Sequence, residues 1–277
     1  MSRLYPIFCN QGRREPKRQQ TAAENLNREK SDLCGNGAHE LQKRTKFISG
    51  RGIIMRKLQV NQVILSTVWT KGICTKHTGK MEGMTSVSSN CQKNDFCAKM
   101  AQIPGTVCQK CYAQRQMKTY PASRKKYSES TDELTSRVLT WQELPHFDDS
   151  VNIVRIEAFG ELNNVTQAIN YVNIIRKSPF INFAWWTKRP KLIAKALKVL
   201  DIEFPDNCNV IYSNPYIDQM PKIRRYDFIK GYFTVWTTEE KALESGQYIN
   251  CGNKKCKNCL NCYDLHEGVF FINELLK

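Results

Sequence analysis

Strand-like and helix-like segments alternate along this chain from residue 55 onward, and no other feature restricts its fold as strongly. Runs of β-branched and aromatic residues, bounded by Gly, Pro or polar residues, predict strands. Strands that alternate with helices of ten or more residues form right-handed βαβ units with parallel strands. The chain is therefore predicted to be an α/β protein, a partial or complete (β/α) barrel of about six parallel strands. These strands are expected at residues 62–69, 151–159, 181–187, 208–213, 232–238 and 269–272.

Three helices are expected between these strands, the first over residues 122–143. The second begins after Asn163 or Asn164, either of which can cap it, and ends before Pro179. The third begins at Pro190, where the missing N–H of proline costs nothing. Apolar residues at helical spacing predict the buried faces of the last two helices: Val165, Ala168, Ile169, Val172 and Ile175, then Leu192, Ile193, Ala196, Leu197 and Leu200.

Eight of the twelve cysteines fall into two short groups, within residues 91–111 and 251–262. No apolar run approaches the roughly 20 residues that span a bilayer, and the first residues lack the apolar stretch of a secretory signal. We therefore expect a cytoplasmic protein without a membrane partner. In a reducing compartment, clustered cysteines are more often metal ligands or redox groups than disulfides.

The first group consists of Cys91, Cys97, Cys108 and Cys111. Two residues separate Cys108 from Cys111, so both sulfurs can reach one metal centre from a single turn. Cys91 and Cys97 are close enough in sequence to complete the shell. Four thiolates suit either zinc or an iron–sulfur cluster, so the spacing predicts a metal site without choosing the metal.

The second group consists of Cys251, Cys256, Cys259 and Cys262. Three cysteines at x2 spacing, with a fourth five residues earlier, are typical of ferredoxin ligand runs. Zinc ribbons usually separate two such pairs by a dozen residues or more. The second group therefore favours an iron–sulfur cluster, with zinc as the alternative.

Two further features resemble radical S-adenosylmethionine enzymes of the spore photoproduct lyase type. The segment Cys108-x-x-Cys111-Tyr-Ala is similar to the end of their cluster-binding loop, and Gly160-Glu161 is similar to the Gly-Glu motif that closes their second barrel strand. The order of elements matches as well: strand, cysteine loop, helix, strand ending in Gly-Glu, helix, strand. The usual loop has the spacing C-x3-C-x2-C, whereas ten residues precede Cys108 here.

This resemblance implies a role for each candidate residue. Cys97, Cys108 and Cys111 would hold a catalytic 4Fe-4S cluster, and the second group would hold an auxiliary one. Glu161 and Gly160 would bind the amino group of S-adenosylmethionine, while Arg155 and Lys188 would line the barrel mouth. If Cys91 also binds the first cluster, the site is closed and serves structure or electron transfer.

Residues 55–277 as a whole resemble the bacteriophage gene product 88 family. The matching elements are Thr78-Gly79-Lys80, the Cys108 to Ala113 segment, Arg155-x4-Gly160-Glu161, Trp186-Thr187-Lys188 and the Cys256 to Cys262 run. The resemblance implies a phage or prophage origin, a bacterial host cell and a metal-dependent role, but no substrate.

Charge points to a class of partner. The chain has 42 Lys and Arg against 26 Asp and Glu, a formal net charge of +16. Such an excess favours polyanions, and nucleic acid comes first among them. No RNA-recognition, helix-turn-helix or Cys2His2 motif supports a particular binding mode.

Residues 1–54 differ from the rest of the chain. They carry eleven basic and five acidic residues and show no sustained periodicity, so we expect a disordered basic extension. Alternatively, Ser49-Gly50-Arg51-Gly52 can be encoded by a purine-rich stretch that would serve as a bacterial ribosome-binding site. Translation would then begin at Met55, and the folded domain would cover residues 55–277.

Two functional hypotheses follow. The first is a radical S-adenosylmethionine-like enzyme that modifies a nucleobase or nucleic acid and takes electrons from a reductant protein. The alternative is a non-enzymatic phage protein, stabilised by zinc or iron–sulfur sites, that binds nucleic acid or a host protein. A metal-assisted hydrolase ranks last, because neither group has paired carboxylates or several histidines nearby.

Overall fold

The computed structural model describes residues 68–222, 226–252, 254–265 and 268–277. The chain divides into two units, residues 1–62 and 63–277, and all described residues belong to the second. The predicted disordered extension and the alternative start at Met55 therefore lie outside the described residues.

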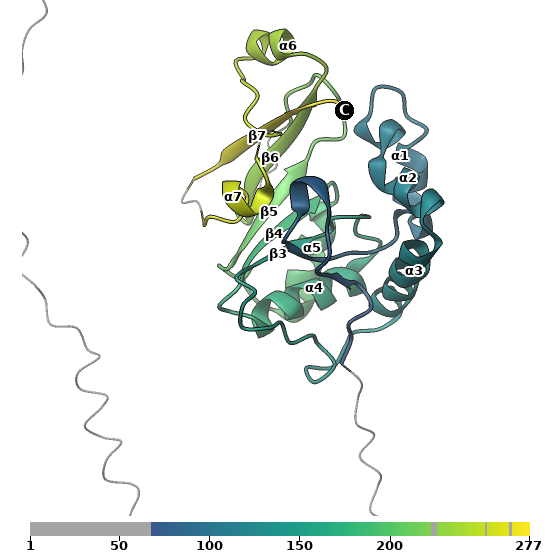
Figure 1. Cartoon of the computed structure of the whole chain (residues 1–277). Helices are drawn as coiled ribbons and strands as arrows, with labels where there is room; N and C mark the ends of the chain where they lie inside the picture. The colour runs from purple at the N-terminus through teal and green to yellow at the C-terminus, as the bar shows by residue number, and fades with distance from the viewer. Residues whose placement is uncertain (1–67, 223–225, 253, 266–267) are drawn as a thin grey trace, which may run out of the picture. The chain divides into compact units, whose positions relative to one another are not determined.

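The second unit is built around a seven-stranded sheet whose strands lie side by side in chain order (Figure 1). The first strand is antiparallel to the second, and every later neighbouring pair is parallel. The strands are β1 (Ile73–Cys74), β2 (Thr85–Val87), β3 (Ile153–Ile156), β4 (Asn182–Thr187), β5 (Cys208–Ser213), β6 (Ile229–Trp236) and β7 (Phe270–Leu275).

Helices fill most of the connections between the parallel strands. Asn164 caps α4 by accepting a hydrogen bond from the N–H of Gln167, and α5 begins at Pro190 as predicted. None of the helices of the described residues is long and apolar enough to cross a membrane. The helices are α1 (Asp95–Met100), α2 (Tyr112–Thr119), α3 (Pro121–Ser136), α4 (Val165–Lys177), α5 (Pro190–Leu200), α6 (Glu239–Glu244) and α7 (Cys256–Cys259).

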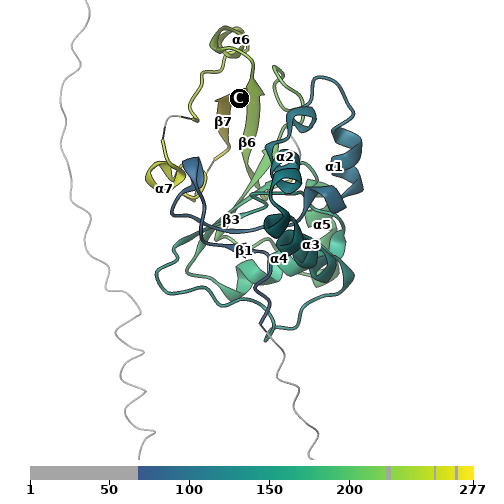
Figure 2. The same cartoon turned by 45° about the vertical axis from the view of Figure 1, so that its right-hand side comes forward.

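The two faces of the sheet are covered differently. One face packs against α4 and α5, and its core includes Ile156, Trp185 and Val210. On the other face, Ala184 and Ile211 share an apolar cluster with Tyr263 and with three cysteines of the second group. The loop that carries α7 therefore packs on the face opposite α4 and α5, and α7 lies apart from these helices in both views (Figures 1 and 2).

The predicted α/β class is confirmed, and the strands predicted from residue 151 onward and the two helices predicted after Asn164 and from Pro190 overlap β3 to β7, α4 and α5, whereas the short helices α6 and α7 were not predicted. The barrel is not confirmed, because β1 and β7 form the two edges of an open sheet among the described residues. The predicted strand at 62–69 is wrong for its two described residues, Val68 and Trp69, which are not in a strand. Trp69 is instead a buried core residue, and its backbone N–H donates to the carbonyl of Glu143.

The first parallel strand is β2, which the sequence did not indicate. The predicted helix over 122–143 also ends early, at Ser136. Its end is fixed by the Asn170 side chain of α4, which donates to the carbonyls of Leu134 and Arg137 and accepts from the N–H of Leu139. The hydrogen bonds of Asn170 thus take the place of the backbone hydrogen bonds that would continue α3 beyond Ser136.

Candidate functional site

The first cysteine group lies at the edge of the sheet where the parallel strands end. The segment from Cys91 to Cys111 follows β2, and the loops after β3 and β4 meet it at the same edge. Ligand sites in open α/β sheets lie outside the carboxyl ends of the strands, so this is the position where a site is expected.

Asn94 attaches Cys97 to the loop that follows β3. Its carboxamide oxygen accepts hydrogen bonds from the N–H groups of Phe96 and Cys97, which caps α1. Its amide nitrogen donates to the carbonyls of Glu161 (2.7 Å) and Leu162 (3.2 Å). The position of Cys97 is therefore fixed to the Gly160-Glu161 segment.

Thr106 anchors the other side of the ten-residue gap before Cys108. Its hydroxyl donates to the carbonyls of Met100 and Ile103, which closes the turn after α1. Thr106 also forms an isolated bridge with Tyr216, and the N–H of Val107 donates to the carbonyl of Pro215 at 2.8 Å. Cys108 is therefore attached to the segment that follows β5.

Glu161 is buried and accepts three hydrogen bonds from donors of its own chain. One carboxylate oxygen accepts from the Thr187 hydroxyl (2.5 Å) and the N–H of Leu162 (2.9 Å), and the other accepts from the N–H of Lys188 (2.7 Å). These bonds join the loop after β3 to the end of β4. The carboxylate therefore serves first to hold Lys188 in place.

Lys188 extends toward the first cysteine group, and its Nζ donates to the Ser213 hydroxyl at 3.2 Å. Burial opposes its charge, but thiolate charge at Cys108, Cys97 and Cys111 and the carboxylate of Glu161 outweigh burial, so the pKa of Lys188 is raised. Conversely, Lys188 favours the ionised form of each of these three thiols, although burial outweighs it at Cys97 and Cys108, whose pKa values are raised. The structure thus gathers three cysteines around one ammonium group.

Cys91 and Cys111 form a hydrogen-bonded pair. The thiol of Cys91 donates to Cys111, which lowers the pKa of Cys111 to about 6 despite burial, with help from the N–H groups of Gln114 and Ala113 at the start of α2. The same bond, together with burial, raises the pKa of Cys91. Cys91 is 1% exposed, so the donor of this pair lies in the core, and Cys111 is its more accessible sulfur.

The second cysteine group lies on the face of the sheet opposite α4 and α5, beside two cations. The Lys80 ammonium donates to the Cys251 sulfur (2.9 Å) and pairs with Glu274 (3.0 Å). Burial raises the pKa of the Cys256 and Cys262 thiols, and the Arg155 guanidinium opposes that rise. Cys259 is the exposed member of the group.

Arg155 lies within β3 rather than at the strand end, and it faces the second group. Its guanidinium lies 4.4 Å from the ring centroid of Trp186 and donates to the Met81 sulfur at 3.7 Å. Its Nε is buried with no hydrogen-bond partner among the described residues. Of the four predicted cofactor-binding residues, Gly160, Glu161 and Lys188 therefore surround the first group, whereas Arg155 lies near Cys256 and Cys262.

A buried hydrogen-bond network around Glu157, next to the first cysteine group, was not predicted from the sequence. Glu157 follows β3 with a left-handed φ of 58° and accepts hydrogen bonds from Ser89, Gln167 and the Tyr171 hydroxyl. Burial raises the pKa of Glu157 to about 8. Gly160, with φ +99°, lies against this network: a Cβ there would be 2.6 Å from the Ser89 carbonyl. The sequence signal that could have identified this network is Glu157 itself, an acidic residue within the apolar run before Gly160.

Neither cysteine group is arranged as the shell of a single metal ion. A zinc ion binds sulfur at about 2.3 Å in tetrahedral geometry, so its ligands are in near contact with one another. Within the part of the chain that the structure describes, no three His, Cys, Asp or Glu side chains are gathered in that way. The all-thiolate donor sets suit an iron–sulfur cluster, whose ligands bind separate iron atoms. The eight ligand assignments stay predictions.

Comparisons with known proteins give one match. A family model described as gene product 88 matches residues 56–269. No curated protein and no solved structure matches the chain.

Proposed function

The chain belongs to the gene product 88 family, a bacteriophage family, and we propose that it is an iron–sulfur enzyme of the radical S-adenosylmethionine type. The observation that carries this proposal is the convergence of Cys97, Cys108 and Cys111 on Lys188 at the carboxyl edge of a parallel sheet. The strand order supports it as well, because β2 to β7 are neighbours in chain order with parallel pairing.

Three ligands, rather than four, follow from the position of Cys91. Its thiol is 1% exposed and donates to Cys111, whereas Cys97, Cys108 and Cys111 are only partly buried. Cys97, Cys108 and Cys111 would therefore hold the cluster, and Cys91 would stand behind Cys111. Held by these three residues, an iron–sulfur cluster would supply the single electron that reductive cleavage of S-adenosylmethionine requires.

The chain's own residues prepare this site. Glu161 holds the backbone of Lys188 and, through its carbonyl, the side chain of Asn94. Three hydrogen bonds leave the Glu161 carboxylate with lone pairs for a cofactor amine, since an ionised carboxylate has about four acceptor sites. Lys188 supplies positive charge beside the three sulfurs, which stabilises thiolates and an anionic cluster.

The second group would hold an auxiliary cluster. Three of its cysteines, Cys251, Cys256 and Cys262, pack on the face of the sheet opposite α4 and α5, with the Lys80 ammonium on Cys251 and the Arg155 guanidinium near Cys256 and Cys262. The unpartnered Nε of Arg155 is a donor that a cluster sulfide would satisfy. This cluster would serve structure or electron transfer from a reductant protein.

Anaerobic purification of the full chain tests the proposal. We expect iron and sulfide in the protein and, after reduction, cleavage of S-adenosylmethionine to 5′-deoxyadenosine. Cys108→Ala should abolish the cleavage, whereas Cys91→Ala should retain it in part, because Cys91 is not a ligand; Cys9→Ala serves as the matched control. A colourless protein with stoichiometric zinc would refute the proposal and support the alternative of a non-enzymatic module.

A further inference from the structure

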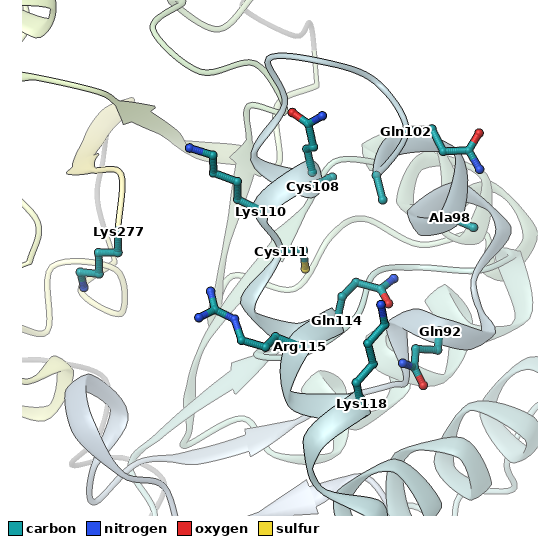
Figure 3. A pocket seen from close by; sticks show the side chains of 12 residues that line it. Gln92, Ala98, Gln102, Cys108, Lys110, Cys111, Gln114, Arg115, Lys118 and Lys277 are labelled. Carbon is teal, nitrogen blue, oxygen red and sulfur yellow. The ribbon is translucent and has the colours of Figure 1, made fainter.

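We propose that the groove beside Cys108 and Cys111 binds a single-stranded nucleic acid. That this strand is the enzyme's substrate rests on the proposed function, whereas its binding rests on the residues of the groove alone. Figure 3 shows the groove, with the cations Lys110, Arg115 and Lys277 on one side of the Cys111 side chain and Gln114, Lys118 and Gln92 on the other.

The lining of the groove is cationic and amide-rich. The groove has a volume of about 810 Å³, enough for one or two nucleotides. No Asp or Glu is among its described lining residues. Besides the two cysteines and two alanines, it is lined by the cations Lys110, Arg115, Lys118 and Lys277 and by the amides Gln92, Gln102, Gln109 and Gln114.

Three of these cations are not neutralised. Lys277 pairs with Glu274 at 2.9 Å. Lys110, Arg115 and Lys118 are exposed and have no ion pair within the described part of the chain. Residues 92–126 contain eight Lys and Arg against a single Asp. An ordinary solvated face intersperses both signs of charge, so this segment is suited to a partner with a charge at every repeat.

Aromatic and amide groups make nucleic acid a better partner than an acidic peptide. Tyr120 ends α2 two residues after Lys118, and 57% of its surface is exposed. Exposed tyrosines beside phosphate-binding cations provide stacking platforms for unpaired bases. The glutamine amides can both donate to and accept from base edges. An acidic peptide would use the cations but neither of these features.

A single strand fits better than a duplex. The two sulfurs lie at the groove, among side chains that project from α2 and the turn before it (Figure 3). Enzymes that act on a base need that base outside the helical stack. An unpaired strand in the groove has its bases free to stack on exposed aromatic rings of this segment, such as Tyr120 at the end of α2.

Binding of fluorescent oligonucleotides to the full chain, followed by anisotropy at several salt concentrations, tests the inference. The groove variant is Lys110→Ala/Arg115→Ala/Lys118→Ala. The control is Lys191→Ala/Lys195→Ala/Lys198→Ala on α5, where the three lysines are also exposed. Because both variants lose three charges, effects of net charge and of the basic residues 1–54 are equal in the two proteins.

We expect the groove variant to bind single strands at least about tenfold more weakly and to lower the slope of log affinity against log salt by about two, since each phosphate contact contributes about 0.7. The control should bind within about twofold of the unmodified chain. Equal losses in both variants, or no loss in the groove variant, would overturn the proposal.

A neutral substitution tests the stacking step. Tyr120→Ala should weaken binding of a single strand about tenfold without changing the salt slope, whereas Tyr248→Ala, which removes another exposed tyrosine, should not. DNA and RNA strands are compared to find which sugar is preferred. A duplex or polyglutamate that binds as tightly as the single strand would contradict the assignment.

These binding assays need neither a cluster nor S-adenosylmethionine. A protein that binds single strands through the groove but does not cleave S-adenosylmethionine would refute the proposed function alone. A protein that cleaves the cofactor but binds no strand would refute this inference alone.

Discussion

The protonation state of Glu157 gives a direct test of the network below the first cysteine group. The carboxyl is 4% exposed and accepts hydrogen bonds from Ser89 (2.8 Å), Gln167 (2.9 Å) and Tyr171 (2.8 Å). Burial nevertheless dominates and raises its pKa from 4.5 to about 8. At neutral pH the buried carboxyl of Glu157 is therefore mainly protonated and uncharged.

The sign of the pH dependence follows from linkage. Between pH 4.5 and about 8 the folded state keeps a proton that the unfolded state has lost, so the free energy of unfolding falls as pH rises through this range. The full difference corresponds to about 5 kcal/mol as an upper limit. Below pH 4.5 and above about 8, Glu157 no longer contributes a slope.

Glu157→Gln removes this titration and keeps the size of the side chain. Urea unfolding followed by tryptophan fluorescence under reducing conditions, from about pH 5 to about pH 8.5, measures the difference in stability between the two proteins. We expect the unmodified chain to lose several kcal/mol relative to the variant across this range. Glu239→Gln on the exposed end of α6 controls for the loss of one acid. Parallel pH profiles for the unmodified chain and Glu157→Gln would show that the hydrogen bonds keep the carboxylate ionised, and would refute the reasoning.

Three further predictions concern Gly160, Cys74 and Asn94. Gly160→Ala should cost more than about 3 kcal/mol in urea unfolding, because the new Cβ meets the Glu157 network, whereas Gly105→Ala, with φ +74° and nothing within 4 Å, should cost about 1 kcal/mol; equal costs would contradict the clash. The pKa of Cys74 is lowered to about 7, first by a hydrogen bond with His77, so its alkylation rate should rise with a midpoint near pH 7 and shift upward in His77→Ala. An unchanged midpoint would exclude the pair. Asn94→Ala should cost about 3 kcal/mol, from the lost α1 cap and two buried loop carbonyls left unpaired, and should lower the iron content of purified protein; retention of both would show that Cys97 is held by other contacts.

Local pattern was sufficient for the second half of the fold. Strands β4 and β5 and helices α4 and α5 are long and strongly apolar, so their own periodicity predicts them. Strand β2 has only three residues, Thr85–Val87, buried among small neighbours, and gives no periodic signal. The end of α3 depends on Asn170, far along the chain, and could not be predicted locally.

The candidate site was predictable in composition but not in arrangement. Cysteine spacing identified both groups, and the Gly-Glu pair identified the loop that meets the first one. The direction of Arg155 was not predictable, because it depends on which face of the sheet the loop with α7 covers. The proton-sharing of Cys91 with Cys111 likewise depends on burial that only the folded chain reveals.

The anchoring of Cys97 and Cys108 has a mechanical consequence. Asn94 fixes Cys97 to the loop after β3, and Thr106 fixes Cys108 to the segment after β5. Strands β3 and β5 lie on either side of β4 in the sheet. The separation of the two sulfurs is therefore tied to the spacing of three neighbouring strands rather than to the ten residues between them. Any motion that spreads or twists this part of the sheet would change the distance between the Cys97 and Cys108 sulfurs. A stiff sheet keeps that distance constant.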